Sequence, residues 1–419
     1  MADSRPNLGR TLASMPSSAP LGRSFLTVLS ASAVDGLGDG ALAAALPLLT
    51  VTITHDPRIV SLVAALAYLP WLLISLPAGA IIDRSDHGRV MWTSQLGQGL
   101  VVGLLAILIA TGHASIPIII LASFLIGIGE VMFSNASQSI IPSVVKTESL
   151  PRSNSLLYIV QTVSQSLAGP PLGSVLFVAA VALPFGVDAA TFVASAALIA
   201  TLPRRKPRVP LPVRVPMRQS IGEGLRWLRS NRLLRTLAVM LGVNNLAGQL
   251  GQATLVLFAT RSLGLTPQLF GLLFVGAALG GVAGGLAAPR IVRALGELRC
   301  LILAPTVISI AYLLGGIVTN GIELGTTLAI GTFAITQWNV VTVSLRQRVV
   351  PSGLLGRVNS VYRMLGWGLI PVGAVLGGWI ASAWGLRAAL PVAGALRAVV
   401  LLVALPSLIA GVRALEKRP

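Results

Sequence analysis

The chain has 419 residues, of which 54% are hydrophobic and only 11% are charged, and its formal net charge is +18. A soluble protein carries about a quarter charged residues, so this composition excludes a soluble globular protein and predicts an all-α polytopic membrane protein. A charge of +18 would also fit a nucleic-acid-binding protein, but the positions of the basic residues argue against one.

Twelve apolar stretches are long enough to cross the hydrocarbon core of a bilayer. We expect a cytoplasmic N-terminal tail (1–23), an N-terminal six-helix bundle (24–203), a cytoplasmic linker (204–232), a C-terminal six-helix bundle (233–411) and a cytoplasmic tail (412–419). The first tail has no apolar core followed by a cleavage site, so no signal peptide is expected. The expected spans are 24–54, 59–82, 90–112, 116–141, 154–180, 185–203, 233–262, 267–289, 298–319, 322–345, 358–383 and 387–411.

The basic residues gather on one side of this map. Twenty-six lysines and arginines fall in the tails and loops of one face, and Arg58, Arg261 and Arg387 fall on the other. Because basic loops stay in the cytoplasm, both termini are expected inside, and the charge marks the membrane face rather than a nucleic-acid site. The excess of arginine over lysine is typical of a high-GC bacterial genome, so we expect the bacterial cytoplasmic membrane.

The first span carries two carboxylates, Asp35 and Asp39. Their spacing of four residues places them on one helix face, and an ionised side chain is costly in a membrane unless it faces a cavity or has a partner. Together with Glu130 of the fourth span they are candidates for proton coupling, with Asp39 first because it lies deeper. The alternative is a structural acid that neighbouring backbone or serine groups satisfy. Asp188, near the outer start of the sixth span, is expected to be a helix-start anion.

A charged loop, Gly79-Ala-Ile-Ile-Asp83-Arg84-Ser-Asp86-His-Gly-Arg89, follows the second span. Asp83 can lie opposite the N-terminal end of a helix, where the helix dipole favours an anion. Arg84 and Arg89 can bridge to carboxylates or lipid headgroups, and Gly79 allows close helix approach. These four residues are candidates for a gating loop, and a structural turn is the alternative.

Polar side chains occur at corresponding positions of the fourth and tenth spans, where Glu130 pairs with Asn339 in the repeat. This predicts a central cavity, and hydrogen bonds between packed helices are the alternative. Arg397 lies about ten residues into the last span, where it can pair with a cavity acid or extend to the membrane surface. Besides Glu130, the candidate cavity residues are Asn135, Gln138, Gln337, Trp338, Asn339 and Arg397.

The fifth span contains Gly169-Pro170-Pro171-Leu-Gly173-Ser174. The prolines cannot donate backbone hydrogen bonds and should bend the helix, while the glycines allow close packing on a partner helix. A bend at a tight contact suits a bundle that rocks, and an inert kink is the alternative.

The two halves repeat each other. Pro171-Leu-Gly-Ser-Val-Leu176 recurs 200 residues later as Pro371-Val-Gly-Ala-Val-Leu376. Six spans separate the copies, which predicts a parallel repeat about an axis along the membrane normal. The linker begins proline-rich, and its second part, 220–229, has apolar residues at helical spacing with arginines opposite, which predicts an interfacial helix rather than a solvated connector.

No catalytic or cofactor pattern is present in the sequence. Cys300 is the single cysteine, the three histidines fall in separate loops, and no phosphate-binding Gly-x-x-x-x-Gly-Lys loop occurs. We therefore expect no enzyme, no metal and no cofactor, and a gradient as the energy source.

The loop from Gly79 to Arg89 resembles the signature loop of major facilitator superfamily transporters, and Gly169-Pro170-Pro171 resembles a motif of facilitator-type drug exporters, with Ser174 in place of its last glycine. Over 24–411 the chain is similar to the bacterial branch that includes the enterobactin exporter and macrolide efflux proteins. The resemblance implies the major facilitator fold and a monomer that exports amphipathic small molecules, such as antibiotics, drugs or siderophores, by proton antiport.

Three alternatives stay open. A proton-coupled importer or a lipid-type flippase would use the same fold, and a membrane sensor or scaffold would need a large soluble domain or long loops. The sequence also departs from many facilitator-type proton antiporters, which have an arginine in the fourth helix, because 115–143 contains none.

Overall fold

The computed structural model describes residues 21–82, 85–145, 149–202 and 217–416, and its regular secondary structure there is entirely helical. The first half forms six membrane-length segments, the fifth of which is divided by a π-helical turn. Its elements are α2 (Arg23–Ile53), α3 (Pro57–Ile82), α4 (His87–Ala110), α5 (Ile116–Val144), α6 (Leu150–Gln161), η2 (Thr162–Ala168), α7 (Gly169–Ala179) and α8 (Leu183–Ala200).

The second half follows a separate helix, α9 (Met217–Ser230), and again forms six segments. Its elements are α10 (Arg232–Gln252), α11 (Leu255–Leu257), η3 (Phe258–Ser262), α12 (Pro267–Leu295), α13 (Glu297–Gly315), α14 (Gly321–Val349), α15 (Ser352–Gly368), α16 (Ile370–Trp384), η4 (Leu386–Ala388) and α17 (Ala389–Glu416).

The helices agree with the expected spans. Among the described residues, ten helical segments are long and apolar enough to cross a membrane. The remaining two segments are the divided fifth span and α10, whose Asn244, Asn245 and Gln249 make it more polar. The predicted fold class, an all-α polytopic membrane protein with twelve membrane helices, is confirmed. The helices lie where the sequence has its long apolar stretches.

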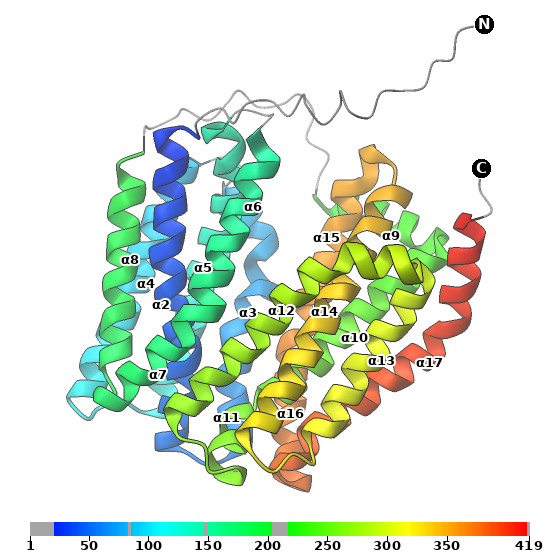
Figure 1. Cartoon of the computed structure of the whole chain (residues 1–419). Coiled ribbons are helices and arrows are strands. Elements are labelled where there is room, and N and C mark those ends of the chain that lie inside the picture. Colours follow the sequence, from blue (N-terminus) through cyan, green and yellow to red (C-terminus); the bar gives the residue numbers. More distant parts are fainter. Residues whose placement is uncertain (1–20, 83–84, 146–148, 203–216, 417–419) are drawn as a thin grey trace, which may run out of the picture.

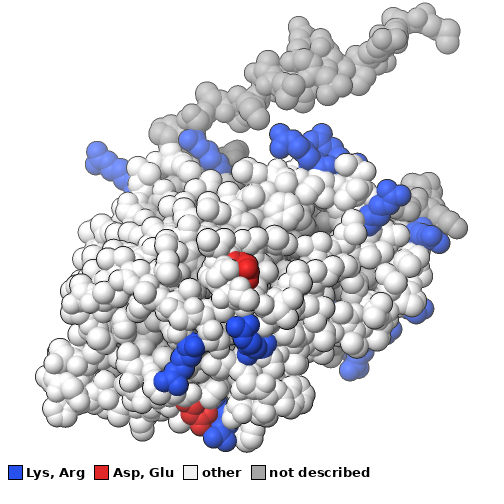
Figure 2. All heavy atoms as spheres, turned by 60° about the horizontal axis from the view of Figure 1, so that its bottom comes forward, with Lys and Arg blue, Asp and Glu red and all other residues white. Residues whose placement is uncertain are grey.

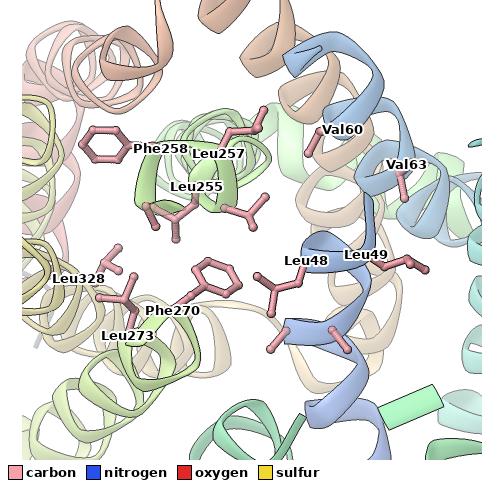
Figure 3. Packing of buried hydrophobic residues seen from close by; sticks show 14 of the residues in the cluster. Leu48, Leu49, Val60, Val63, Leu255, Leu257, Phe258, Phe270, Leu273 and Leu328 are labelled. Carbon is pink, nitrogen blue, oxygen red and sulfur yellow. The ribbon is translucent and has the colours of Figure 1, made fainter. Parts of the chain in front are cut away.

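The two halves lie side by side and meet at the end farthest from the chain termini (Figure 1). A buried apolar cluster joins them there, with Leu48 and Val63 from the first half and Leu255 and Phe270 from the second. In Figure 3 the Leu48 side chain points toward the Phe270 ring. At the other end, the helices of the two halves are spread apart in Figure 1. The apolar contact therefore closes one end of the molecule.

Glycines bring α2 against the divided fifth helix. A Cβ on Gly40 would lie 2.9 Å from Gly169 Cα, and a Cβ on Gly173 would overlap the Ala41 carbonyl oxygen. No larger residue leaves room for this approach, which is the reason small residues occur where membrane helices cross. The close packing predicted for Gly169 and Gly173 is present.

The Pro170–Pro171 pair follows a π-helical turn. Gly169 N–H donates to the Ser164 carbonyl, five residues earlier rather than four. Proline lacks an N–H and its ring crowds the carbonyl one turn before it, so a wider turn accommodates both prolines. The irregular helix expected from the sequence therefore takes the form of a π-bulge.

Helix α9 occupies the second part of the linker, where a helix was expected. Glu223 forms an ion pair with Arg357 of α15, and a Cβ on Gly224 would lie 2.7 Å from the Arg357 carbonyl oxygen. Leu228 is buried against the second half. The helix is thus docked on α15 by a charge pair and by apolar contacts, in addition to any contact with lipid.

Charged side chains are sparse on the face of the molecule drawn in Figure 2. Figure 2 shows a broad uncharged surface, with basic residues gathered along its upper edge and a few charges at the end brought forward. An uncharged belt between two charged rims is the surface that a bilayer requires, because an exposed charge in hydrocarbon is costly.

The expected orientation can be tested with single cysteines. Ser115 and Ser149 begin α5 and α6 and so lie at opposite ends of α5. We expect Ser115→Cys to react with a membrane-impermeant maleimide in intact cells, and Ser149→Cys to react only after permeabilisation. The native Cys300 is buried, so the parent protein serves as the unlabelled control. The reverse labelling pattern would place the termini outside.

Candidate functional site

Asp35 lies inside the N-terminal half, hydrogen-bonded to α4. The residue is 5% exposed, and its Oδ1 accepts a hydrogen bond of 2.7 Å from Gln95 Nε2. Gln95 Oε1 is also buried and has no partner among the described residues. Among the residues that the structure describes, this neutral amide is the hydrogen-bond donor to the carboxyl group, and no cation pairs with Asp35 there.

The sequence-based interpretation of Asp188 is wrong. It was expected to be a helix-start anion, but α8 begins at Leu183 and has no acidic residue in its first turn. The side chain is 0% exposed and lies against the backbone of α2, since a Cβ on Gly38 would overlap its Oδ1. A carboxyl group in an otherwise apolar span was the sequence signal that could have identified it.

Asp39 and Glu130 complete a group of four acids in the N-terminal half. Both are partly exposed, in contrast to Asp35 and Asp188. The charges of Asp35, Asp39, Glu130 and Asp188 are close enough to interact with one another. The structure therefore brings together the three predicted proton-coupling candidates and adds Asp188.

This group has no basic partner in the described part of the chain. The ion pairs there join Arg58 to Asp56, Arg348 to Glu297 and Arg357 to Glu223, and none involves the four acids. Several buried carboxylates cannot all be ionised without a cation, because desolvation and mutual repulsion both disfavour the charged forms. The arrangement is therefore suited to binding protons.

Two of the predicted cavity residues are buried in contacts between helices, and a cavity lined by the others stays a prediction. Gln337 Nε2 donates to the Gly284 carbonyl of α12 at 2.6 Å, and Trp338 is buried in an apolar cluster of the second half. Gln138 and Asn339 are exposed, and Asn135 Nδ2 donates at 2.8 Å to the Val131 carbonyl in its own helix. For Gln337 and Trp338 this placement fits helix packing, the alternative that the sequence left open.

Arg397 is buried in the C-terminal half, with 4% of the residue exposed. Its Nη2 donates to the Asn244 carbonyl at 2.9 Å, and its guanidinium carbon lies 3.9 Å from the centre of the Tyr312 ring. Nε and Nη1 have no partner among the described residues. The side chain therefore does not reach the membrane surface, pairs with no acid among the described residues, and keeps two guanidinium nitrogens without an acceptor.

The predicted gating loop is described only in part. Gly79 lies within α3, whereas Asp83 and Arg84 lie outside the described residues. Arg89 has an exposed side chain in the first turn of α4, and its backbone N–H donates at 2.8 Å to Asp86 Oδ1. Asp86 thus caps α4, and the gating role of the loop stays a prediction.

The fifth-helix motif lies at a contact between the halves. A Cβ on Gly271 of α12 would overlap Ser174 Oγ and would lie 2.9 Å from the Pro170 carbonyl oxygen. A second contact joins Trp71 of α3 and Trp367 of α15, whose rings stack with centroids 4.6 Å apart. No sequence pattern indicated this aromatic pair, because 296 residues separate its two members along the chain.

A family model described as transmembrane secretion effector matches residues 15–418. The staphyloferrin A transporter of Staphylococcus aureus is 24% identical over 342 residues, which are 80% of this chain and 84% of that transporter. The uncharacterized MFS-type transporter YfiS of Bacillus subtilis is 24% identical over 255 residues, or 59% of this chain and 60% of YfiS. A bacterial homologue of the iron transporter ferroportin, in its inward-facing state, has the same fold, with a TM-score of 0.72 and 15% identity over 94% of this chain and 99% of that chain.

Proposed function

Because the chain belongs to the transmembrane secretion effector family of the major facilitator superfamily, it is a multi-pass membrane transporter of small molecules rather than an enzyme, and we propose that it exports amphipathic substrates from the bacterial cytoplasm by proton antiport. The observation that carries the export direction is the match of the secretion-effector model to residues 15–418. The Gly169-Pro170-Pro171 motif, typical of facilitator-type exporters, supports the same direction.

The contacts between the halves support transport by alternating access. The apolar cluster around Leu48 and Phe270 closes the end away from the termini. With the termini in the cytoplasm, this closed end faces outward and the spread helices face the cytoplasm. Export then requires the halves to rock about contacts such as Pro170–Gly271, so that the outer apolar contact opens while the cytoplasmic ends approach one another.

Proton coupling rests on the four acids of the N-terminal half. Asp39 and Glu130 are the two that are partly exposed, which supports exchange of their protons with water. His87 is the first residue of α4, and His55 and His113 lie outside the helices, so carboxyl groups are the candidate proton-binding side chains inside the described spans. Inward proton movement can then drive outward substrate movement.

The substrate class is an amphipathic small molecule, such as an antibiotic, a drug or a siderophore. The similarity to the staphyloferrin A transporter supports the siderophore class. Arg397, with two unpartnered donors, would suit an anionic substrate group if the transport cycle exposes it. A proton-coupled importer and a lipid-type flippase are the alternatives on this fold. A sensor or scaffold would need a large soluble domain, and the described residues contain none.

The proposal is tested in a bacterial host that lacks its own efflux pumps. We expect expression of the chain to raise resistance several-fold to a subset of amphipathic antibiotics and to lower their cell-associated amount, with a proton uncoupler abolishing the effect. The control is the Asp39→Asn variant at equal membrane abundance, which should not protect the cells. Increased uptake of the same compounds would instead identify an importer.

A further inference from the structure

Asp188 is the most deeply buried of the four acids and the one that sequence reasoning did not assign to transport. Its side chain is 0% exposed on α8, and its Oδ1 lies against the α2 backbone at Gly38, between Asp35 and Asp39 in the sequence. Glycine at this position is required by the approach, because a Cβ there would overlap both Asp188 and Thr191. The structure thus makes room on α2 for this carboxyl group.

The carboxyl group is almost without hydrogen-bond donors. Thr191 Oγ1 donates to the Asp188 backbone carbonyl at 2.7 Å, which leaves only a long contact of 3.4 Å to Oδ1. Oδ2 is buried and has no hydrogen-bond partner in the described part of the chain. This unpartnered, fully buried oxygen is an observation independent of the clustering of the acids.

The helices that pack against α8 supply no positive charge next to Asp188. Helix α2 contributes Asp35 and Asp39, and Glu130 of α5 is the next charged group. Helix α4 contributes neutral glutamines in its middle, with Arg89 in its exposed first turn, and α7 carries no titratable side chain. The described surroundings of Asp188 are therefore neutral or negative.

An ionised carboxylate in this position would be desolvated without compensation and would face acids on the adjacent helix, whereas a neutral carboxylic acid avoids both costs. A neutral Asp188 also removes the need for donors around Oδ2, which has no hydrogen-bond partner among the described residues. The geometry is therefore that of a protonated acid.

We propose that Asp188 holds a proton at neutral pH and exchanges it with the carboxyl groups of α2, so that the proton-binding site has a buried member on α8 and an accessible member at Asp39. In the exchange, the O–H bond of Asp188 breaks and a new O–H bond forms on an α2 carboxylate, so the charge of the group is conserved. The inference rests on the proposed proton coupling, but its test does not require a transported substrate.

The test is infrared difference spectroscopy of the full-length protein in lipid vesicles, titrated with acid and base. We expect the wild type at neutral pH to show the C=O stretching band of a protonated carboxylic acid, and Asp188→Asn to lose one component of it. Asp56→Asn is the matched control: the Arg58 side chain and backbone N–H lower the pKa of Asp56, so this partly exposed carboxyl outside the membrane helices is ionised at neutral pH and its loss should leave the band unchanged.

A second readout examines the coupling to α2. Replacing the proton-binding carboxyl group of Asp188 should move the pH midpoint for protonation of the remaining acids by about one unit, which is a tenfold change in proton affinity. An unchanged band and an unchanged midpoint in a folded Asp188→Asn protein would overturn the proposal. If Asp188→Asn does not fold, Asp188→Glu is measured in its place. Because this variant restores a carboxyl group, it should retain the band component. If the carboxylic acid band changes as expected but the protein shows no pH-driven transport, the result would contradict the proposed antiport and not the proposed protonation of Asp188.

Discussion

Asp39→Asn is expected to abolish transport against a substrate gradient while leaving downhill exchange. The amide keeps the shape of the side chain but cannot bind and release a proton, and Asp39 is a partly exposed member of the acidic group, through which protons can reach the buried acids. The measurement is substrate accumulation in proteoliposomes with an imposed pH difference. We expect the variant to equilibrate the substrate without concentrating it.

The same assay separates the acids from one another. Asp35→Asn and Glu130→Gln are measured alongside, and Asp56→Asn provides a carboxylate outside the membrane helices whose loss should not affect coupling. If Asp39→Asn, Asp35→Asn and Glu130→Gln all keep full pH-driven transport, the hypothesis that these carboxyl groups couple transport to protons is wrong. A sodium-driven, uniport or substrate-exchange mechanism would then replace it.

The second large effect is expected at the crossing of α2 and α7. In Gly173→Ala the new methyl group would overlap the Ala41 carbonyl oxygen and lie 2.5 Å from Ala41 Cα, and both are backbone atoms that cannot turn aside. Overpacking of this kind costs about 1–3 kcal/mol, and relief requires the two helices to move apart. We expect a lower thermal unfolding temperature in detergent and a smaller folded yield.

Gly97→Ala is the matched control for this prediction. Gly97 also lies in a membrane helix, but a Cβ there would meet nothing within 4 Å. Alanine stabilises a helix by about 0.5–1 kcal/mol relative to glycine, so this variant should unfold at the same or a higher temperature. Equal unfolding temperatures for Gly173→Ala and the wild type would mean that α2 and α7 are not in close contact.

Much of the fold could be predicted from the sequence, because membrane insertion depends on properties that are local in the chain. An apolar run of sufficient length forms a helix in lipid whatever its neighbours are, since every backbone group must be hydrogen-bonded there. The spans expected at 116–141 and 298–319 accordingly coincide with α5 and α13 within a few residues. The amphipathic part of the linker likewise forms α9. The carboxyl groups Asp35, Asp39 and Glu130 were identifiable because ionisable side chains are rare in spans.

The direction in which each side chain points was decided only by the tertiary structure. A helix in lipid is apolar on every side, so its hydrophobic pattern does not reveal which face is turned toward other helices. For this reason the contact of Asp188 with α2 was not predicted, and Gln337 was expected in a cavity although it hydrogen-bonds to α12. The Trp71–Trp367 stack depends on how two helices from different halves are rotated and placed, and no local pattern encodes that relation. Composition and span length thus determined that the chain is a membrane protein with helices at these positions, whereas the packing of helices distant in sequence determined which acids lie together and where the halves meet.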